Sequence, residues 1–320
     1  MPCFHPLDGY KSSTGKWISE KTHHLQEELT IPCGKCTGCR TEYSRQWAIR
    51  IAHEEQWWKK KDKYSTFITL TYNDKWLPPH NTLIKEDFQK FMKRLRKKKN
   101  STKDNPLRFY ACGEYGEKNE RPHYHAILFN CSFKKDADIS NGKNKLYFSQ
   151  QLQDAWSHYN KKTETYDPLG FVSWGEVTFD SAAYVANYVQ KKINGKKKDE
   201  HYQIENPICP KTGEYRTHRQ QEFSLMSRKP GIASDWLTHY KDDVYPSDFI
   251  TINGRKIRPP KAYDKIYERT HKQELEAIKE IRKQEMEKTS HLRTPEALAF
   301  QERTHKARMA LKQQKRRNIL

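Results

Sequence analysis

Two histidines separated by one residue stand at the start of an apolar run, RPHYHAILF, residues 121–129. On a β-strand, residues i and i+2 project from the same face, so His123 and His125 would lie side by side. Two imidazoles at this spacing can bind one divalent cation if a neighbouring strand supplies a third ligand. The alternative is a pair of polar residues on an exposed strand face, and the motif alone does not exclude it.

A carboxylate is available on the preceding segment. Residues 107–116, LRFYACGEYG, have the composition of a strand, and a short loop containing Gly116 leads to the histidine strand. This order predicts an antiparallel hairpin with Glu114 on the paired strand just before the turn, and Glu117 as the alternative ligand. A histidine and carboxylate set with open positions suits Mg²⁺ or Mn²⁺ acting on a phosphate, rather than a closed structural zinc site.

A second group of reactive side chains follows in YVANYVQKK, residues 184–192. Tyr184, Tyr188 and Lys191 fall on one face of a predicted helix, and small or apolar residues occupy the opposite face. A phenol has a pKa of about 10, so attack on a phosphate requires a nearby cation or base. Lys191 could lower that pKa or neutralise a phosphate oxygen. The alternative is an aromatic stripe buried in the core.

Seven cysteines occur, and three of them are clustered in PCGKCTGCR as Cys33, Cys36 and Cys39. The odd number and the clustering argue against a secreted disulfide scaffold. Cys3 or His5 could complete a tetrahedral set for structural Zn²⁺. Reduced cysteines on a turn-rich loop are the alternative, and an iron–sulfur cluster lacks its usual fourth-ligand pattern.

The elements that must position these residues alternate between strand and helix patterns. The expected strands are residues 63–73, 107–116, 121–129 and 170–179, and the expected helices are 44–61, 84–99, 148–159 and 181–192. The second of these helices places Ile84, Phe88, Phe91 and Leu95 on one face. The order β-α-β-β-α-β-α after the first helix, with antiparallel neighbours, predicts an α+β sheet covered by helices.

Composition limits the partners. The chain has 320 residues, of which 34% are hydrophobic and 31% charged, so one core with long solvated segments is expected. The net charge of +20 favours nucleic acid, with an anionic membrane surface as the second candidate. Lysines interleaved with aromatic residues, as at 57–61, suit single-stranded DNA. We find no membrane-spanning apolar run and no signal peptide, so a soluble cytoplasmic protein is expected.

The segment after residue 261 has strong helix propensity, many charges and few apolar residues. It is expected to be a solvated arm that orders on DNA or on a partner, or a helix that only links and solubilises.

Taken together, these motifs resemble the HUH endonuclease superfamily, and in particular the replication initiators of gokushovirus-like microviruses, which are small single-stranded-DNA phages. The resemblance covers roughly residues 1–235. It is carried by PCGKCTGCR, CGEYGEKNERPHYHAILF, AAYVANYVQKK and SRKPG.

The resemblance implies an HUH fold with a ferredoxin- or RRM-like palm, in three parts. These are a cysteine-containing segment (1–45), an endonuclease domain (46–250) and a basic helical arm (251–320). It implies a rolling-circle initiator, a nickase with strand-joining activity, located in the cytoplasm of the bacterial host. Tyr184 and Tyr188 would be the nucleophiles and Lys191, or Lys192, the helper. His123, His125 and Glu114 would bind Mg²⁺ or Mn²⁺.

The implied partners are single-stranded or locally melted origin DNA and host helicase and polymerase, with no membrane. Plasmid replication proteins, relaxases and single-strand transposases share this chemistry. A non-catalytic, zinc-stabilised nucleic-acid-binding protein is the alternative from a different class.

Overall fold

The computed structural model describes residues 3–22, 26–116, 119–140, 145–178, 181, 185–186, 197–252 and 254–317. The chain divides into two compact units. The sheet unit comprises residues 47–243, and the terminal unit comprises residues 1–46 together with 244–320. The three-part division expected from the sequence stays a prediction. The two compact units group the residues differently, because the terminal unit contains both ends of the chain.

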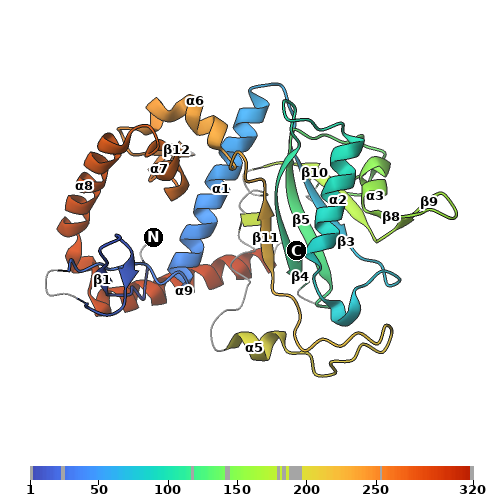
Figure 1. Cartoon of the computed structure of the whole chain (residues 1–320), viewed down its shortest axis with the longest axis horizontal. Helices are drawn as coiled ribbons and strands as arrows, with labels where there is room; N and C mark the ends of the chain where they lie inside the picture. Colours follow the sequence, from blue (N-terminus) through green and yellow to red (C-terminus); the bar gives the residue numbers. More distant parts are fainter. Residues whose placement is uncertain are drawn as a thin grey trace. The chain divides into compact units, whose positions relative to one another are not determined.

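An antiparallel sheet dominates the sheet unit (Figure 1). Within the described residues it has seven strands in the order β11-β4-β5-β3-β10-β7-β6. The strands are β3 (Thr66–Thr71), β4 (Arg108–Tyr115), β5 (Pro122–Phe129), β6 (Ala137–Asp138), β7 (Tyr147–Phe148), β10 (Val172–Glu176) and β11 (Phe223–Met226). The α+β class expected from the sequence is therefore confirmed.

Helices and one separate hairpin complete this unit. They are α1 (Thr37–Lys59), whose residues from Trp47 onward belong to the sheet unit, α2 (Lys85–Lys98), α3 (Gln150–Ala155), α5 (Lys197–Tyr202), α6 (Ser234–Val244), and β8 (Ser157–Asn160) paired with β9 (Thr165–Pro168). A short 3₁₀ turn, Pro79–Asn81, precedes α2. Among the described residues, none of the helices combines the length and the apolar character that crossing a bilayer requires.

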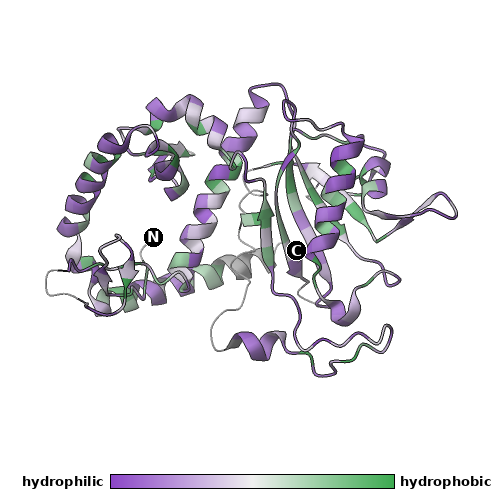
Figure 2. Cartoon of the chain, viewed as in Figure 1, coloured by the Kyte–Doolittle hydropathy of each residue, from purple (hydrophilic) through white to green (hydrophobic). Residues whose placement is uncertain are grey.

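Helix α2 forms because its apolar side chains recur at helical spacing. Phe88, Phe91, Met92 and Leu95 are buried, while the last turn carries Arg96, Lys97 and Lys98 beside the helix C-terminus. These apolar side chains join Ile68, Leu70 and Trp156 in one core cluster against the sheet. In Figure 2 the visible turns of α2 are hydrophilic and the strands behind them are hydrophobic.

The two faces of the sheet have different neighbours because successive strand residues alternate between faces. Tyr124, Ala126 and Leu128 of β5 belong to the core cluster that includes α2. On the opposite face, Tyr110 of β4 contacts Trp47 of α1, with ring centroids 4.8 Å apart.

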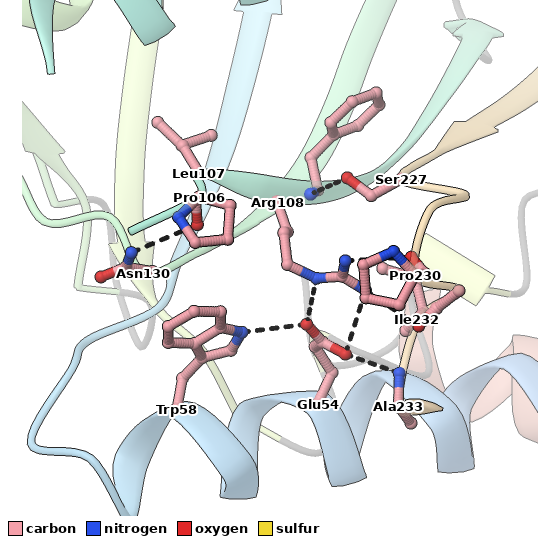
Figure 3. A network of polar contacts seen from close by, with 12 residues as sticks. Glu54, Trp58, Pro106, Leu107, Arg108, Asn130, Ser227, Pro230, Ile232 and Ala233 are labelled. Carbon is pink, nitrogen blue, oxygen red and sulfur yellow. Dashed lines mark hydrogen bonds and ion pairs between the residues drawn. The ribbon is translucent and has the colours of Figure 1, made fainter. Parts of the chain in front are cut away.

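A buried network fastens β4 to α1 (Figure 3). The Arg108 guanidinium donates from Nε to Glu54 Oε1 at 2.6 Å, and the two side chains are 4% and 2% exposed. Arg108 also donates to the carbonyl oxygens of Pro230 and Gly231 at 2.9 Å. Glu54 accepts further hydrogen bonds from the indole of Trp58 and the backbone N–H of Ala233. Both charged groups are therefore fully engaged inside the unit.

Several elements differ from the sequence expectation. Helix α1 begins at Thr37, seven residues before the expected start, and its first turn therefore includes Cys39. The prediction of a helix over residues 148–159 was wrong after residue 155, because α3 ends at Ala155 and β8 begins at Ser157. Trp156 is fully buried and its indole donates to the carbonyl of Thr71 at 2.7 Å, which holds the chain at this change of direction.

The terminal unit contains short strands and the C-terminal helices. They are β1 (Tyr10–Lys11), β2 (Trp17–Ile18), β12 (Ile250–Ile252), β13 (Arg255–Ile257), α7 (Lys261–Tyr267), α8 (Lys272–Lys288), a 3₁₀ turn at Ser290–Arg293, and α9 (Pro295–Arg317).

The segment after residue 261, expected to be a solvated arm, is anchored in part. Leu275, Ile278 and Leu298 are buried. Arg282 forms ion pairs with Asp248 at 2.5 Å and with Asp264 at 2.7 Å. The low apolar content of the segment does not reveal these ion pairs, whose partners are 34 and 18 residues apart along the chain.

Candidate metal centre

The three expected ligands lie on two adjacent strands of the sheet. In the β4–β5 pair, Glu114 is directly opposite His123, and His125 is opposite Cys112. On its other side β5 pairs with β3, where Thr71 is opposite His123 and Thr69 is opposite His125. Because strand residues alternate, Glu114 and both histidines project from the sheet face that also carries Arg108 and Tyr110. The predicted hairpin is confirmed.

The three side chains converge on one point. His123 Nε2 lies 2.7 Å from Glu114 Oε1, and His125 Nε2 lies 3.2 Å from the same oxygen. The two imidazole rings are 5.0 Å apart and nearly perpendicular. One ligand atom from each residue lies within 4.8 Å of the others. This spacing is compatible with a single cation bound between them.

The outer nitrogen of each imidazole is also held. His123 Nδ1 lies 3.1 Å from the carbonyl oxygen of Arg121, and His125 Nδ1 lies 3.0 Å from the hydroxyl of Thr69. The ring of Phe67 stacks on His125. Contacts of this kind fix the orientation and tautomer of metal-binding histidines.

The hydrogen-bond partners of His123 are compatible with a positive charge at the centre. A carbonyl oxygen only accepts, so the contact with Arg121 O is a hydrogen bond when His123 Nδ1 carries the ring proton. In the neutral ring, Nε2 then presents a lone pair to the Glu114 carboxylate, which also only accepts. A second proton on the ring or a bound cation resolves this conflict. The residues present therefore fit a divalent metal.

Glu114 supplies the negative charge of this candidate set. It is 2% exposed, and this burial raises the pKa of its carboxyl group. Hydrogen bonds from His123 and His125 outweigh the burial and lower the pKa to about 2. The group is thus ionised throughout the neutral range, as a metal-binding carboxylate must be.

A pocket of about 420 Å³ opens beside His123. Its lining residues are Thr71, Tyr72, Asn73, Asp74, Arg121, Pro122, His123 and Phe171. Arg121 pairs with Asp74 at 2.6 Å and stays partly exposed, and the ring of Phe171 is 72% exposed. A cation and an exposed aromatic residue therefore lie in the lining of the pocket that reaches His123.

The other expected catalytic residues lie elsewhere in the chain. Tyr184, Tyr188, Lys191 and the alternatives Lys192 and Glu117 lie outside the described residues. Val185 and Ala186, between the two tyrosines, are helical and buried. Ala186 belongs to the face that the sequence predicts to be apolar. Cys3, Cys33, Cys36 and Cys39 come together in the terminal unit.

Sequence reasoning missed three residues of this region: Thr69, Arg121 and Phe171. Thr69 carries a usable signal, because it is a hydroxyl residue at an alternating position of a strand that precedes the histidines. Arg121 directly precedes the histidine strand, but the contact of its carbonyl with a ring nitrogen depends on the turn geometry. Phe171 lies about fifty residues further along and reaches the pocket only through the pairing of β10 with β3.

The chain is similar to known replication-associated proteins. A family model described as "Replication-associated protein ORF2/G2P" matches residues 65–193, a range that includes the three ligands and both tyrosines. The chain is 31% identical over 283 residues to the replication-associated protein VP4 of Bdellovibrio phage phiMH2K, covering 85% of this chain and 78% of that protein. The chain belongs to the phage replication-associated protein family.

Two further members of the family are similar. The replication-associated protein ORF2 of Spiroplasma virus 4 is 28% identical over 313 residues, covering 90% of this chain and 88% of that protein. The replication-associated protein ORF4 of Chlamydia phage 1 is 29% identical over 194 residues, covering 58% of this chain and 42% of that protein. No solved structure matches this replication-associated protein.

Proposed function

We propose that this protein initiates rolling-circle replication of a single-stranded-DNA phage by nicking one DNA strand at the origin. The observation that carries the proposal is the convergence of Glu114, His123 and His125 on one point beside an open pocket. Membership of the phage replication-associated family supports it, because the relatives bear names that refer to replication.

We assign the sheet to the HUH endonuclease fold. The assignment is supported by the position of the two histidines on β5, which is hydrogen-bonded to β4 on one side and β3 on the other. Helices cover both faces of these strands, with α2 on one and α1 on the other. A site on paired inner strands is rigid, which suits the positioning of a reacting phosphate.

His123, His125 and Glu114 would hold one Mg²⁺ or Mn²⁺. When bound, this cation polarises the scissile phosphate and stabilises the negative charge that develops on it. Arg121 O and Thr69 Oγ keep both imidazole rings turned toward Glu114. The three side chains are therefore already turned toward one point.

The pocket beside His123 would receive the DNA. Arg121 lies where it can contact a backbone phosphate, and Phe171 offers a free face on which a base can stack. The net charge of +20 favours a polyanionic partner. Single-stranded or locally melted origin DNA is thus the substrate that these groups recognise, with host helicase and polymerase as later partners.

Tyr184 and Tyr188 would be the nucleophiles. The phenol oxygen attacks the scissile phosphorus and loses its proton, and a bond forms between tyrosine and the 5′-phosphate. The bond from phosphorus to the 3′ oxygen breaks, and that oxygen takes up a proton to become the 3′-OH that primes synthesis. Lys191 would lower the phenol pKa or neutralise a phosphate oxygen. Two tyrosines allow one to hold the 5′ end while the other cuts the regenerated origin.

The test uses the full-length protein and overlapping single-stranded oligonucleotides from the genome that encodes it. With Mn²⁺ or Mg²⁺ we expect an adduct that resists SDS, and with EDTA none. Tyr184→Phe and Tyr188→Phe should each retain some adduct, and the double variant should form none. An adduct in the double variant would overturn the assignment of the nucleophiles.

The metal ligands are tested in the same assay. His123→Ala should abolish the adduct while leaving the circular dichroism spectrum unchanged, because the ring occupies the edge of the pocket. His218→Ala removes an exposed histidine outside the site and is the matched control. Full activity of His123→Ala would refute the ligand role. If wild type forms no adduct with any oligonucleotide but binds them, the protein is a non-catalytic nucleic-acid-binding protein.

A further inference from the structure

The terminal unit brings four thiols from two distant segments to one point. Cys3 lies near the N-terminus, while Cys33, Cys36 and Cys39 lie just before and in the first turn of α1. One sulfur from each lies within 4.8 Å of the others. Cys3 Sγ is 3.5 Å from Cys33 Sγ and 3.9 Å from Cys36 Sγ. All four are free thiols.

These separations match tetrahedral coordination of zinc. With zinc–sulfur bonds of about 2.3 Å, two ligands at the tetrahedral angle are about 3.8 Å apart. The two sulfur–sulfur distances around Cys3, 3.5 and 3.9 Å, lie on either side of that value. Four thiolates leave no open coordination position, so such a site is structural rather than catalytic.

Backbone N–H groups point at the sulfur atoms, as a cluster of thiolates requires. Cys33 N donates to Cys3 Sγ at 3.2 Å, and Cys36 N donates to Cys33 Sγ at 3.4 Å. Phe4 N and Cys39 N both donate to Cys36 Sγ at 3.4 Å. Four thiolates and one Zn²⁺ carry a net charge of −2, which these donors and the N-terminus of α1 stabilise.

The surrounding segment is held by backbone bridges such as Leu7 with Ile31, but its apolar core is very small. Among its described residues, 3–36 contain two strands of two residues each, and Phe4 is the one buried apolar side chain there. A chain segment with so small a core depends on a metal or disulfide for stability.

The cluster also lies beside the C-terminal helix of the same unit. The ring of Phe4 contacts His305 of α9, with centroids 5.6 Å apart, and the hydroxyl of Thr41 lies 3.2 Å from the same imidazole. His5 pairs with Glu302 at 2.9 Å. Whatever fixes Cys3 and the start of α1 therefore also fixes the contact surface for α9.

We propose that Cys3, Cys33, Cys36 and Cys39 bind one structural Zn²⁺ that fastens the N-terminus to α1 and thereby holds α9 in the terminal unit. The site is separate from the Glu114 centre in ligands, in metal and in the unit to which it belongs. Its loss would loosen the terminal unit while leaving the histidine centre intact.

The experiment measures zinc in full-length protein after gel filtration in EDTA. Wild type should retain about one zinc per chain, and Cys36→Ser and Cys3→Ser less than about half. Cys209→Ser, a buried cysteine of the sheet unit, is the matched control and should retain zinc. The double variant His123→Ala/His125→Ala should also retain it, which separates this site from the proposed nickase centre.

A second measurement uses wild type alone, so that it does not depend on the folding of any variant. Titration of wild type with a mercurial reagent, read with a zinc indicator, should release one zinc as the four cluster thiols react. Limited proteolysis should then cleave α9 faster in the zinc-free protein than in the zinc-bound one. Wild type that carries no zinc, carries iron instead, or contains a disulfide within the cluster would overturn the proposal.

Discussion

Replacing Arg108 by methionine should destabilise the sheet unit more than any substitution of an exposed ion pair. Arg108 is the charge partner of Glu54, and both side chains are almost completely buried. Methionine fills a similar volume but leaves the Glu54 carboxylate inside the protein with hydrogen bonds from Trp58 and Ala233 alone. It also leaves the carbonyl groups of Pro230 and Gly231 without their guanidinium donors.

The magnitude follows from the unpaired charge. Removing one partner of a buried ion pair costs about 3–5 kcal/mol of unfolding free energy. With a urea dependence of about 2 kcal/mol per molar, a loss of about 4 kcal/mol lowers the unfolding midpoint by about 2 M. Arg121→Met is the matched control, because its pair with Asp74 is exposed and should contribute about 0–1 kcal/mol.

A second substitution tests whether charge is the cause. Glu54→Gln in the wild-type background leaves the buried Arg108 guanidinium without its counter-charge and should also destabilise by about 3–5 kcal/mol. In the Arg108→Met background the same change removes an unpaired charge while keeping an acceptor for Trp58, so it should stabilise. Urea unfolding followed by tryptophan fluorescence measures all four proteins. If Glu54→Gln has the same sign and size in both backgrounds, the charge-pair explanation is refuted.

Three further predictions concern the same unit. His53 stacks on Trp236, and burial lowers the pKa of its imidazole to about 3. As the pH falls below about 6.5, the unfolded chain therefore binds a proton at this residue that the folded protein does not bind. The free energy of unfolding should then fall by about 1.4 kcal/mol per pH unit. His53→Phe should make the thermal unfolding midpoint less dependent on pH between pH 6.5 and 4.5 than in wild type. The same slope of midpoint against pH in both proteins would contradict this. Gly170→Ala would place its Cβ 2.0 Å from the backbone oxygen of Thr71 in β3. We expect the free energy of unfolding to fall by at least about 3 kcal/mol in thermal unfolding. A midpoint equal to that of wild type would show that the two segments do not approach so closely. Tyr124→Phe removes the two hydrogen bonds with Ile84 at the N-terminal end of α2. The free energy of unfolding measured in urea should fall by about 1–3 kcal/mol. An unchanged free energy would show that water replaces these hydrogen bonds.

The parts of the fold that depend on short-range patterns were predictable from the sequence. The spacing of Phe88, Phe91 and Leu95 predicts α2, and its buried residues agree. The alternation in residues 121–129 places His123 and His125 on one face, and the turn at Gly116 places Glu114 opposite them. Each of these inferences needs only the period of one element or the length of one loop.

The rest depended on contacts between distant segments. The order of β10 beside β3 and the pocket residue Phe171 follow from pairing across about a hundred residues, which no local pattern encodes. The start of β8 was missed because the residues after Ala155 have intermediate helix propensity and carry no helix stop signal, and burial of Trp156 decides the outcome. The joining of the two chain ends in one unit involves ion pairs such as Arg282 with Asp248, which composition does not reveal.

Tyr124 stands between the two histidines and points to the other face of the sheet. Its hydroxyl lies 2.8 Å from that of Tyr72, accepts the backbone N–H of Ile84 at 3.1 Å and donates to the Ile84 carbonyl at 2.8 Å. A slip of one residue in the pairing of β5 would move this phenol to the face that carries Glu114 and push both imidazoles into the apolar layer. Incorrect pairing of β5 would therefore lower the stability of the sheet. The stably folded protein is thus the one in which His123 and His125 project toward Glu114.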